Sequence, residues 1–200
     1  MKQKFVDKCI SIIQSNNENL SKKELDKMRY GLEGLYLTIT KIIVILIISS
    51  ILNIFKETIL LILIFNGIRF TAFGVHAKRS IDCLISSILF FIGFPILCIK
   101  LTIPIFIKYI IFVPIIILIG IYAPSDTQKR PLKDKNKRII YKVASVLIAM
   151  AYMIISIVIK DNTISNCFIF ALIIQVIVIL PITYKIFGVE YNNYKKFETN

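Results

Sequence analysis

Long apolar runs separated by short polar segments constrain this chain more than any other feature. Hydrophobic residues make up 56% of its 200 residues, and charged residues only 18%. An α-helix needs about 20 apolar residues to cross the hydrocarbon core of a bilayer, whereas a soluble domain needs a more polar surface. The sequence therefore predicts an all-α membrane protein with about six transmembrane helices. We place the spans at residues 36–55, 57–73, 82–99, 101–122, 139–159 and 164–184.

The second of these spans is the weakest. Its strongly apolar stretch, Ile59 to Phe65, is short, and Asn66, Gly67 and Arg69 follow directly. We therefore expect a tilted, broken or partly re-entrant element at this position.

The first 34 residues are polar and rich in lysine, unlike a cleavable signal peptide. Apolar residues from Phe5 to Ile13 recur at helical spacing, which predicts an amphipathic helix on the membrane interface. Ser21 and Glu24 have the spacing of a capping box, so a second helix starts there and leads into the first span. An alternative role for this segment is a platform for an amphipathic peptide partner. The predicted organisation is interfacial helices at 1–34, a membrane domain at 35–185 with a basic loop at 124–142, and a tail at 186–200.

The formal net charge of +13 reflects membrane orientation rather than nucleic-acid binding. Basic residues cluster between the apolar runs, and we find no basic module with interleaved aromatic residues, so we expect no nucleic-acid partner. Residues 1–34 and the loop 124–142 each carry seven basic side chains, and Lys185, Lys195 and Lys196 follow near the end. The positive-inside rule places all three regions in the cytoplasm. We therefore expect a multi-pass protein of the cell membrane with both termini in the cytoplasm.

The only histidine, His76, lies seven residues before Cys83, one of four cysteines. The cysteines are widely spread and form no C-x-x-C pair, which argues against a disulfide framework and a zinc site. A thiolate is the reactive form of cysteine, and an imidazole can take the thiol proton and return it to a leaving amine. His76 and Cys83 are therefore candidate catalytic residues that need no metal or other cofactor. Asp82 could orient the imidazole or could point away from it. The alternative is a plain cytoplasmic loop, which Lys78 and Arg79 fit as orientation signals but which needs neither His76 nor Cys83.

Helix geometry limits how His76 and Cys83 can meet. Seven residues on one straight helix separate two side chains by roughly 10 Å along the axis, whereas a hydrogen bond needs about 3 Å. Either the chain bends between them or the partner comes from another protomer, which leaves a homodimer open. We favour a loop that carries His76 and leads into a helix with Cys83 in its first turn, where the helix dipole favours a thiolate.

The segment Gly74-Val75-His76-Ala77 followed by Cys83 resembles the accessory gene regulator B family, AgrB. Tyr122-Ala123-Pro124, which leads through basic residues to Pro131, is similar to a second segment of that family. The resemblance implies a membrane cysteine endopeptidase of quorum sensing whose partners are the lipid bilayer and a short AgrD-like precursor peptide. It implies catalytic roles for His76 and Cys83 and supporting roles for Arg69 and Gly74. The chain departs from the family at Phe73, where a second glycine is common.

The resemblance also implies a reaction. Cys83 would cleave the precursor between its signal segment and its acidic C-terminal tail, and would hold the signal segment as an acyl-thioester. An internal cysteine or serine of the peptide would then close a thiolactone or lactone ring without ATP or metal. Lys129 and Arg130 in the basic loop are candidate substrate-binding residues for the acidic tail, although topology alone also explains their charge.

Two other classes of membrane protein are less consistent with the sequence. A non-enzymatic polytopic protein, such as a small transporter or an assembly factor, would need polar residues at mid-span in several helices. The predicted spans contain few of these apart from Gln175 and some hydroxyl groups. A metal-dependent protease would need an H-E-x-x-H motif, which a chain with one histidine cannot form.

The predicted topology can be tested by labelling single-cysteine variants in intact cells. We expect cysteines placed at positions 135 and 195 to be protected from a membrane-impermeant maleimide until the cells are opened. Labelling of either position from outside would contradict a cytoplasmic location of the basic loop or of the tail.

Overall fold

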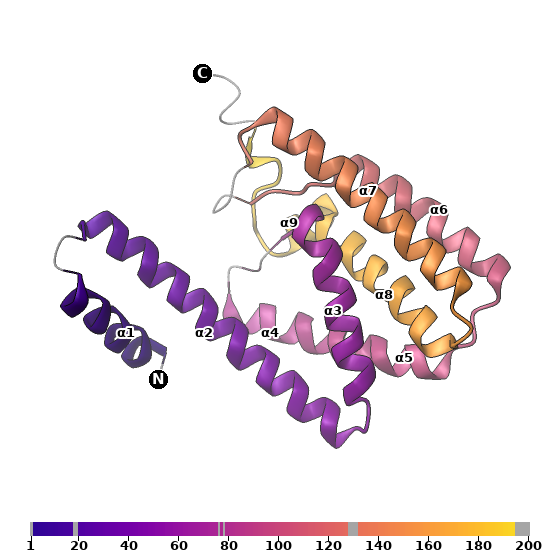
Figure 1. Ribbon diagram of the computed structural model, residues 1–200, viewed down its shortest axis with the longest axis horizontal. Coiled ribbons are helices and arrows are strands. Elements are labelled where there is room, and N and C mark those ends of the chain that lie inside the picture. Colours follow the sequence, from indigo (N-terminus) through magenta and orange to yellow (C-terminus); the bar gives the residue numbers. More distant parts are fainter. Residues whose placement is uncertain (1, 18–19, 76, 78, 128–131, 195–200) are drawn as a thin grey trace. The chain divides into compact units, whose positions relative to one another are not determined.

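The computed structural model describes residues 2–17, 20–75, 77, 79–127 and 132–194 (Figure 1). These residues form helices and no β-strand, which confirms the all-α class. The chain divides into two units, Met1–Ile47 and Ile48–Asn200, and each is described by itself. In chain order the helices are α1 (Lys2–Asn16), α2 (Lys22–Ile51), α3 (Phe55–Ala72), α4 (Ser80–Ile88), the π-helical turn η1 (Leu89–Gly93), α5 (Phe94–Lys100), α6 (Ile105–Tyr122), α7 (Lys135–Val158), α8 (Asn162–Ile179) and α9 (Pro181–Ile186).

Five helical segments of the described chain are long and apolar enough to cross a bilayer. They are Glu24–Ile51, Ser80–Lys100, Ile105–Tyr122, Lys135–Val158 and Asn162–Ile179. The remaining predicted span corresponds to α3, which has 18 residues but includes Lys56, Glu57 and Arg69. The protein is therefore a multi-pass helical membrane protein, and six is an approximate number of spans.

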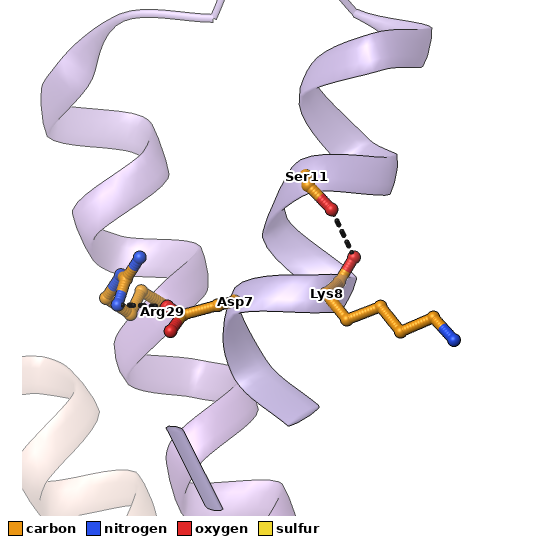
Figure 2. Close-up of polar contacts among 4 residues, drawn as sticks. All are labelled: Asp7, Lys8, Ser11 and Arg29. Atoms are coloured by element: carbon orange, nitrogen blue, oxygen red, sulfur yellow. Dashed lines mark hydrogen bonds and ion pairs between the residues drawn. The ribbon is translucent and has the colours of Figure 1, made fainter. Parts of the chain in front are cut away.

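In the N-terminal unit, α1 and α2 are joined by an ion pair. Oδ1 of Asp7 on α1 lies 2.7 Å from Nη1 of Arg29 on α2, and Figure 2 shows this pair beside the bond from the Ser11 hydroxyl to the Lys8 carbonyl. The predicted capping box is present at the start of α2. The amide of Ser21 donates to Oε2 of Glu24 at 2.9 Å, and the amide of Glu24 donates to the hydroxyl oxygen of Ser21 at 3.4 Å.

Helix α8 forms the centre of the second unit. It packs against α3, α5, α6 and α7, and Figure 1 shows it running between α3 and α7. Its apolar residues cover every face, as expected for a helix surrounded by other helices. In α8, 67% of the residues in the apolar stretch are buried, compared with 22% or less in the other candidate spans. Because α8 contacts so many neighbours, its C-terminal end can position several loops at once.

Proline residues move two helix ends away from the predicted spans. Helix α6 begins at Ile105 rather than residue 101, directly after Pro104. Helix α8 ends at Ile179, whereas the predicted span ran to residue 184, and α9 begins at Pro181. Proline lacks an N–H group and disfavours helical backbone at the preceding residue, and Leu180 is extended with φ −65° and ψ 138°. The break redirects the chain at the end of α8.

The membrane helices hold more buried polar groups than the sequence predicted. Lys108 on α6 is only 6% exposed, and its Nζ donates to the Ser165 hydroxyl on α8 and to the Ser156 carbonyl on α7. Nδ2 of Asn166 donates to the carbonyls of Cys98 and Leu101, at 3.1 and 2.7 Å. The expectation of few polar residues concerned the middle of the spans, and Lys108 and Asn166 add buried polar groups outside it. Both residues lie near helix ends, where they bond carbonyl or hydroxyl groups of neighbouring helices.

We expect Asn166→Ala to lower the thermal stability of the purified protein. The substitution removes two buried hydrogen bonds between α8 and the end of α5 and leaves two carbonyls without these donors, a loss of about 1–3 kcal/mol. Thermal unfolding in detergent should show the loss, and Asn136→Ala, at an exposed position on α7, is the matched control. Equal melting temperatures for the two variants would contradict this role of Asn166.

Candidate functional site

The C-terminal end of α3 is tied to the chain that follows it by the side chain of Arg69. Its Nη1 donates to the carbonyl of Phe73 at 2.6 Å, and its Nη2 donates to the carbonyls of Gly74 and Val75 at 3.1 and 2.9 Å. Carbonyls at a helix C-terminus lack intrahelical partners, and the helix dipole favours a cation there. One guanidinium therefore fixes three successive residues immediately before position 76.

Position 74 requires glycine for two reasons: its backbone has a positive φ, and its surroundings leave no space for a Cβ atom. Gly74 is buried and has a φ of 127°, a conformation that side chains disfavour. A Cβ atom at this position would lie 2.8 Å from the carbonyl oxygen of Val178 and would overlap Nη1 of Arg69. Any larger residue would therefore displace either the end of α8 or the guanidinium.

The segment after α6 pairs with this turn. The amide of Gly74 donates to the carbonyl of Ser125 at 2.9 Å, and the amide of Ser125 donates to the carbonyl of Ala72 at 3.0 Å. Together these bonds form a single parallel bridge between Phe73 and Ser125. The two sequence segments that carry the family resemblance, one around Gly74 and one at Tyr122-Ala123-Pro124, are thus neighbours in the fold.

The end of α8 and the start of α9 also hold the turn at residues 72–75 and the segment that pairs with it. The amide of Val75 donates to the carbonyl of Val178 at 2.9 Å, and Nε2 of the buried Gln175 donates to the carbonyl of Phe73 at 2.8 Å. From α9, the hydroxyl of Tyr184 lies 3.0 and 3.1 Å from the carbonyls of Ser125 and Asp126. Three parts of the chain, residues 72–75, 125–126 and 175–184, therefore hold one another in a single hydrogen-bonded cluster.

Cys83 lies in the first turn of α4, as the sequence predicted. The helix starts at Ser80, Arg79 before it is extended, and the amide of Cys83 donates to the carbonyl of Arg79 at 3.3 Å. The side chain of Cys83 is half-buried. Cys83 therefore lies at the start of the helix that follows the turn held by Arg69.

The backbone between the turn and α4 is not helical at the described positions. Gly74, Val75, Ala77 and Arg79 all lie outside helices. The described residues between the turn and α4 therefore do not continue the helix that carries Cys83. Asp82 lies in the same turn as Cys83, and its carbonyl accepts a hydrogen bond from the Ser86 hydroxyl at 2.7 Å.

A buried carboxylate joins this cluster to the C-terminal segment. Oδ2 of Asp126 accepts the amides of Leu132 and Tyr194 at 3.2 and 3.0 Å, and Oδ1 accepts the amide of Asn193 at 3.2 Å. Burial raises the pKa of the Asp126 carboxyl, and these three amides and the nearby Arg138 act against that rise. Residues 193–194 are thereby fastened beside the segment that pairs with Gly74.

Three of the predicted site residues, His76, Lys129 and Arg130, lie outside the described residues. Of the other cysteines, Cys98 and Cys167 are fully buried in the apolar core, in agreement with a packing role. Sequence reasoning missed the contributions of Gln175, Ser125 and Tyr184. An isolated amide in an apolar span, such as Gln175, indicates a buried polar contact. The sequence does not show the partner, because Phe73 lies 102 residues away.

The comparisons with known proteins agree with one another. A model of the accessory gene regulator B family matches residues 6–179. An AgrB-like protein of Clostridium acetobutylicum is 35% identical over 175 residues, which cover 88% of this chain and 84% of that protein. Accessory gene regulator protein B of Staphylococcus epidermidis is 34% identical over 184 residues, covering 90% and 93%. The protein of the same name from Staphylococcus aureus strain Newman is 33% identical over 178 residues, covering 88% and 92%.

No solved structure matches the chain. The matched region includes the turn from Arg69 to Val75, Cys83 and the segment around Ser125. The family match covers most of the sequence, and the relatives align over nearly their whole length. The chain therefore belongs to the accessory gene regulator B family.

Proposed function

We propose that this protein is a membrane cysteine endopeptidase that processes a short, AgrD-like precursor of a quorum-sensing peptide. The observation that carries the proposal is the turn held by the Arg69 guanidinium, which leads to position 76 and on to Cys83 in the first turn of α4. The thiolate of a cysteine is its nucleophilic form.

The proposed reaction begins with proton transfer from the thiol of Cys83 to the imidazole of His76. The thiolate attacks the carbonyl carbon of the peptide bond between the signal segment and the tail, so a sulfur–carbon bond forms and the carbon–nitrogen bond breaks. The imidazolium gives its proton to the departing amine. The signal segment then remains on Cys83 as an acyl-thioester.

Release of the product needs a second nucleophile from the peptide itself. Its internal cysteine or serine attacks the thioester carbonyl, His76 takes the proton, and Cys83 departs as the thiolate. A thioester is exchanged for a thioester or an ester, so the ring closes without ATP or a metal ion. Because water would hydrolyse the acyl-enzyme, this chemistry benefits from a site bordered by apolar helices.

Arg69 and Gly74 act in this proposal as positioning residues rather than as reacting groups. Arg69 uses its donors on three carbonyls of the turn, and Gly74 leaves room for that guanidinium. We assign Lys129 and Arg130 to binding of the acidic tail, and we keep Asp82 as a supporting residue. Both termini and the basic loop lie in the cytoplasm in this proposal, with residues 1–34 at the membrane interface, the membrane domain at 35–185 and the tail at 186–200.

We expect Cys83→Ala to abolish cleavage of the precursor, and Cys83→Ser to be nearly as poor because a hydroxyl is much harder to ionise than a thiol. His76→Ala should lose both proton transfers and slow the reaction by about 10²–10⁴-fold. Because the two residues act as a unit, the double variant should be little slower than either single variant. The rates can be measured with purified protein in vesicles, with Cys9→Ala as the control. A Cys83→Ala variant that still cleaves would contradict the proposal.

We expect Gly74→Ala to reduce both stability and cleavage. The new Cβ would collide with Val178 and Arg69 and would keep an unfavourable φ, at a cost of about 1–3 kcal/mol. Gly93→Ala is the matched control, because a Cβ at Gly93 meets no atom within 4 Å. Thermal unfolding and cleavage rates would be measured for both variants. Normal cleavage by Gly74→Ala would show that the turn does not position the reacting groups.

A further inference from the structure

A pocket outside the Arg69 cluster lies between the end of α6, the start of α7 and the C-terminal segment. Its volume is about 240 Å³. Two cations, three tyrosines and an asparagine supply its polar lining: Arg138, Lys142, Tyr122, Tyr191, Tyr194 and Asn192. None of the described residues that line the pocket is acidic. An anionic ligand would therefore meet two positive charges in the lining and no opposing carboxylate.

The pocket lies where two membrane helices end. Tyr122 is the last residue of α6 and Arg138 is the fourth residue of α7, and both helices are candidate spans. Tyrosine is enriched at the boundary between membrane and water, because its ring is apolar and its hydroxyl is polar. Ile121 and Ile139 also line the pocket, and both are more than half exposed. The pocket therefore combines a charged interior with an apolar rim at the membrane boundary.

Arg138 has a hydrogen-bond donor that the described part of the chain does not use. Its guanidinium carbon lies 3.2 Å from the centre of the Tyr194 ring, so the cation is stacked on an aromatic face. Its Nη1 atom is buried and has no hydrogen-bond partner among the described residues. A buried guanidinium N–H without an acceptor is costly, which favours a ligand that supplies a charged oxygen.

The carboxylate of Asp126 holds the aromatic wall of the pocket in place. Its two oxygens accept three backbone amides, those of Leu132, Asn193 and Tyr194. These bonds fix the backbone that carries the Tyr194 ring, on which Arg138 stacks. Asp126 therefore contributes to the shape of the pocket, while its oxygens bond these amides and leave Nη1 of Arg138 without an acceptor.

A phospholipid matches both parts of the pocket. A phosphodiester carries one negative charge on two free oxygens, and a guanidinium binds two such oxygens through parallel hydrogen bonds. Lys142, which is exposed and lies four residues after Arg138 on the same face of α7, adds a second cation. Acyl chains would cover Ile121 and Ile139, whereas a water-soluble anion would leave this apolar rim uncovered. Basic pockets between membrane helices are typical sites for the head groups of anionic lipids.

We propose that this pocket binds one anionic phospholipid, with its phosphodiester on Arg138 and Lys142 and its acyl chains along Ile121 and Ile139. The bound lipid joins the end of α6, the start of α7 and the C-terminal segment. It thereby stabilises the chain that leads into Ser125, the residue that pairs with the turn before position 76. The inference does not depend on the proposed function, because lipid binding requires no reaction at Cys83.

The test uses native mass spectrometry of the full-length protein in neutral detergent, titrated with phosphatidylglycerol or with phosphatidylcholine of the same acyl chains. We expect phosphatidylglycerol to occupy one site about tenfold more tightly, because it alone carries a net negative charge. Arg138→Gln and Lys142→Gln should each weaken its binding by about tenfold, toward the value for phosphatidylcholine. The matched control is Lys135→Gln, which removes the same charge from an exposed position outside the pocket and should keep the preference.

Two competitors identify the source of the anion. Glycerophosphoglycerol is the same phosphodiester without acyl chains, and a glutamate-rich peptide supplies carboxylates without phosphate. Neither should displace phosphatidylglycerol at the concentration at which the lipid saturates its site, and displacement by either one overturns the proposal. The proposal is also overturned if Arg138→Gln and Lys142→Gln keep the preference for phosphatidylglycerol as Lys135→Gln does. Lys142 is exposed, so Lys142→Gln keeps the test valid if Arg138→Gln fails to fold.

Discussion

The hydrogen bonds from Arg69 to three consecutive carbonyls are the interaction on which the candidate site depends. They satisfy the carbonyls beyond the last turn of α3 and hold a backbone conformation that Phe73 and Gly74, both with positive φ, would not adopt unaided. A single guanidinium therefore couples the end of α3 to the chain that approaches position 76.

Support for this turn comes from parts of the chain that are far apart in sequence. The Ser125 backbone pairs with Gly74 and Ala72, Gln175 and Val178 bond the turn from α8, and Tyr184 bonds the carbonyl of Ser125. Helix α8 can make these contacts because Pro181 ends it at the level of the turn and because its other faces are fixed by neighbouring helices. A proline that shortens a predicted span thus becomes part of the geometry of the site.

The sequence predicted those features that depend on local patterns. Apolar runs located the membrane helices, and the Ser21–Glu24 spacing located the start of α2. The need to bring His76 and Cys83 together favoured a loop that leads into a helix with Cys83 in its first turn. Features that depend on distant partners were not predictable in the same way. Nothing local shows that Gln175 bonds Phe73, that Asp126 binds the amides of residues 193 and 194, or that Lys108 bonds two serines on other helices. These contacts depend on which helices become neighbours, and hydropathy alone does not specify that.

The proposed function requires a covalent intermediate between Cys83 and the peptide, and this intermediate can be trapped. A precursor whose internal cysteine is replaced by alanine cannot close the ring, so the signal segment should accumulate on the enzyme. Mass spectrometry of the protein in vesicles should then show the added mass of the signal segment on Cys83, and no such mass on the Cys83→Ala variant. Cleavage of the precursor without an adduct on Cys83, together with continued cleavage by Cys83→Ala, would rule out Cys83 as the nucleophile.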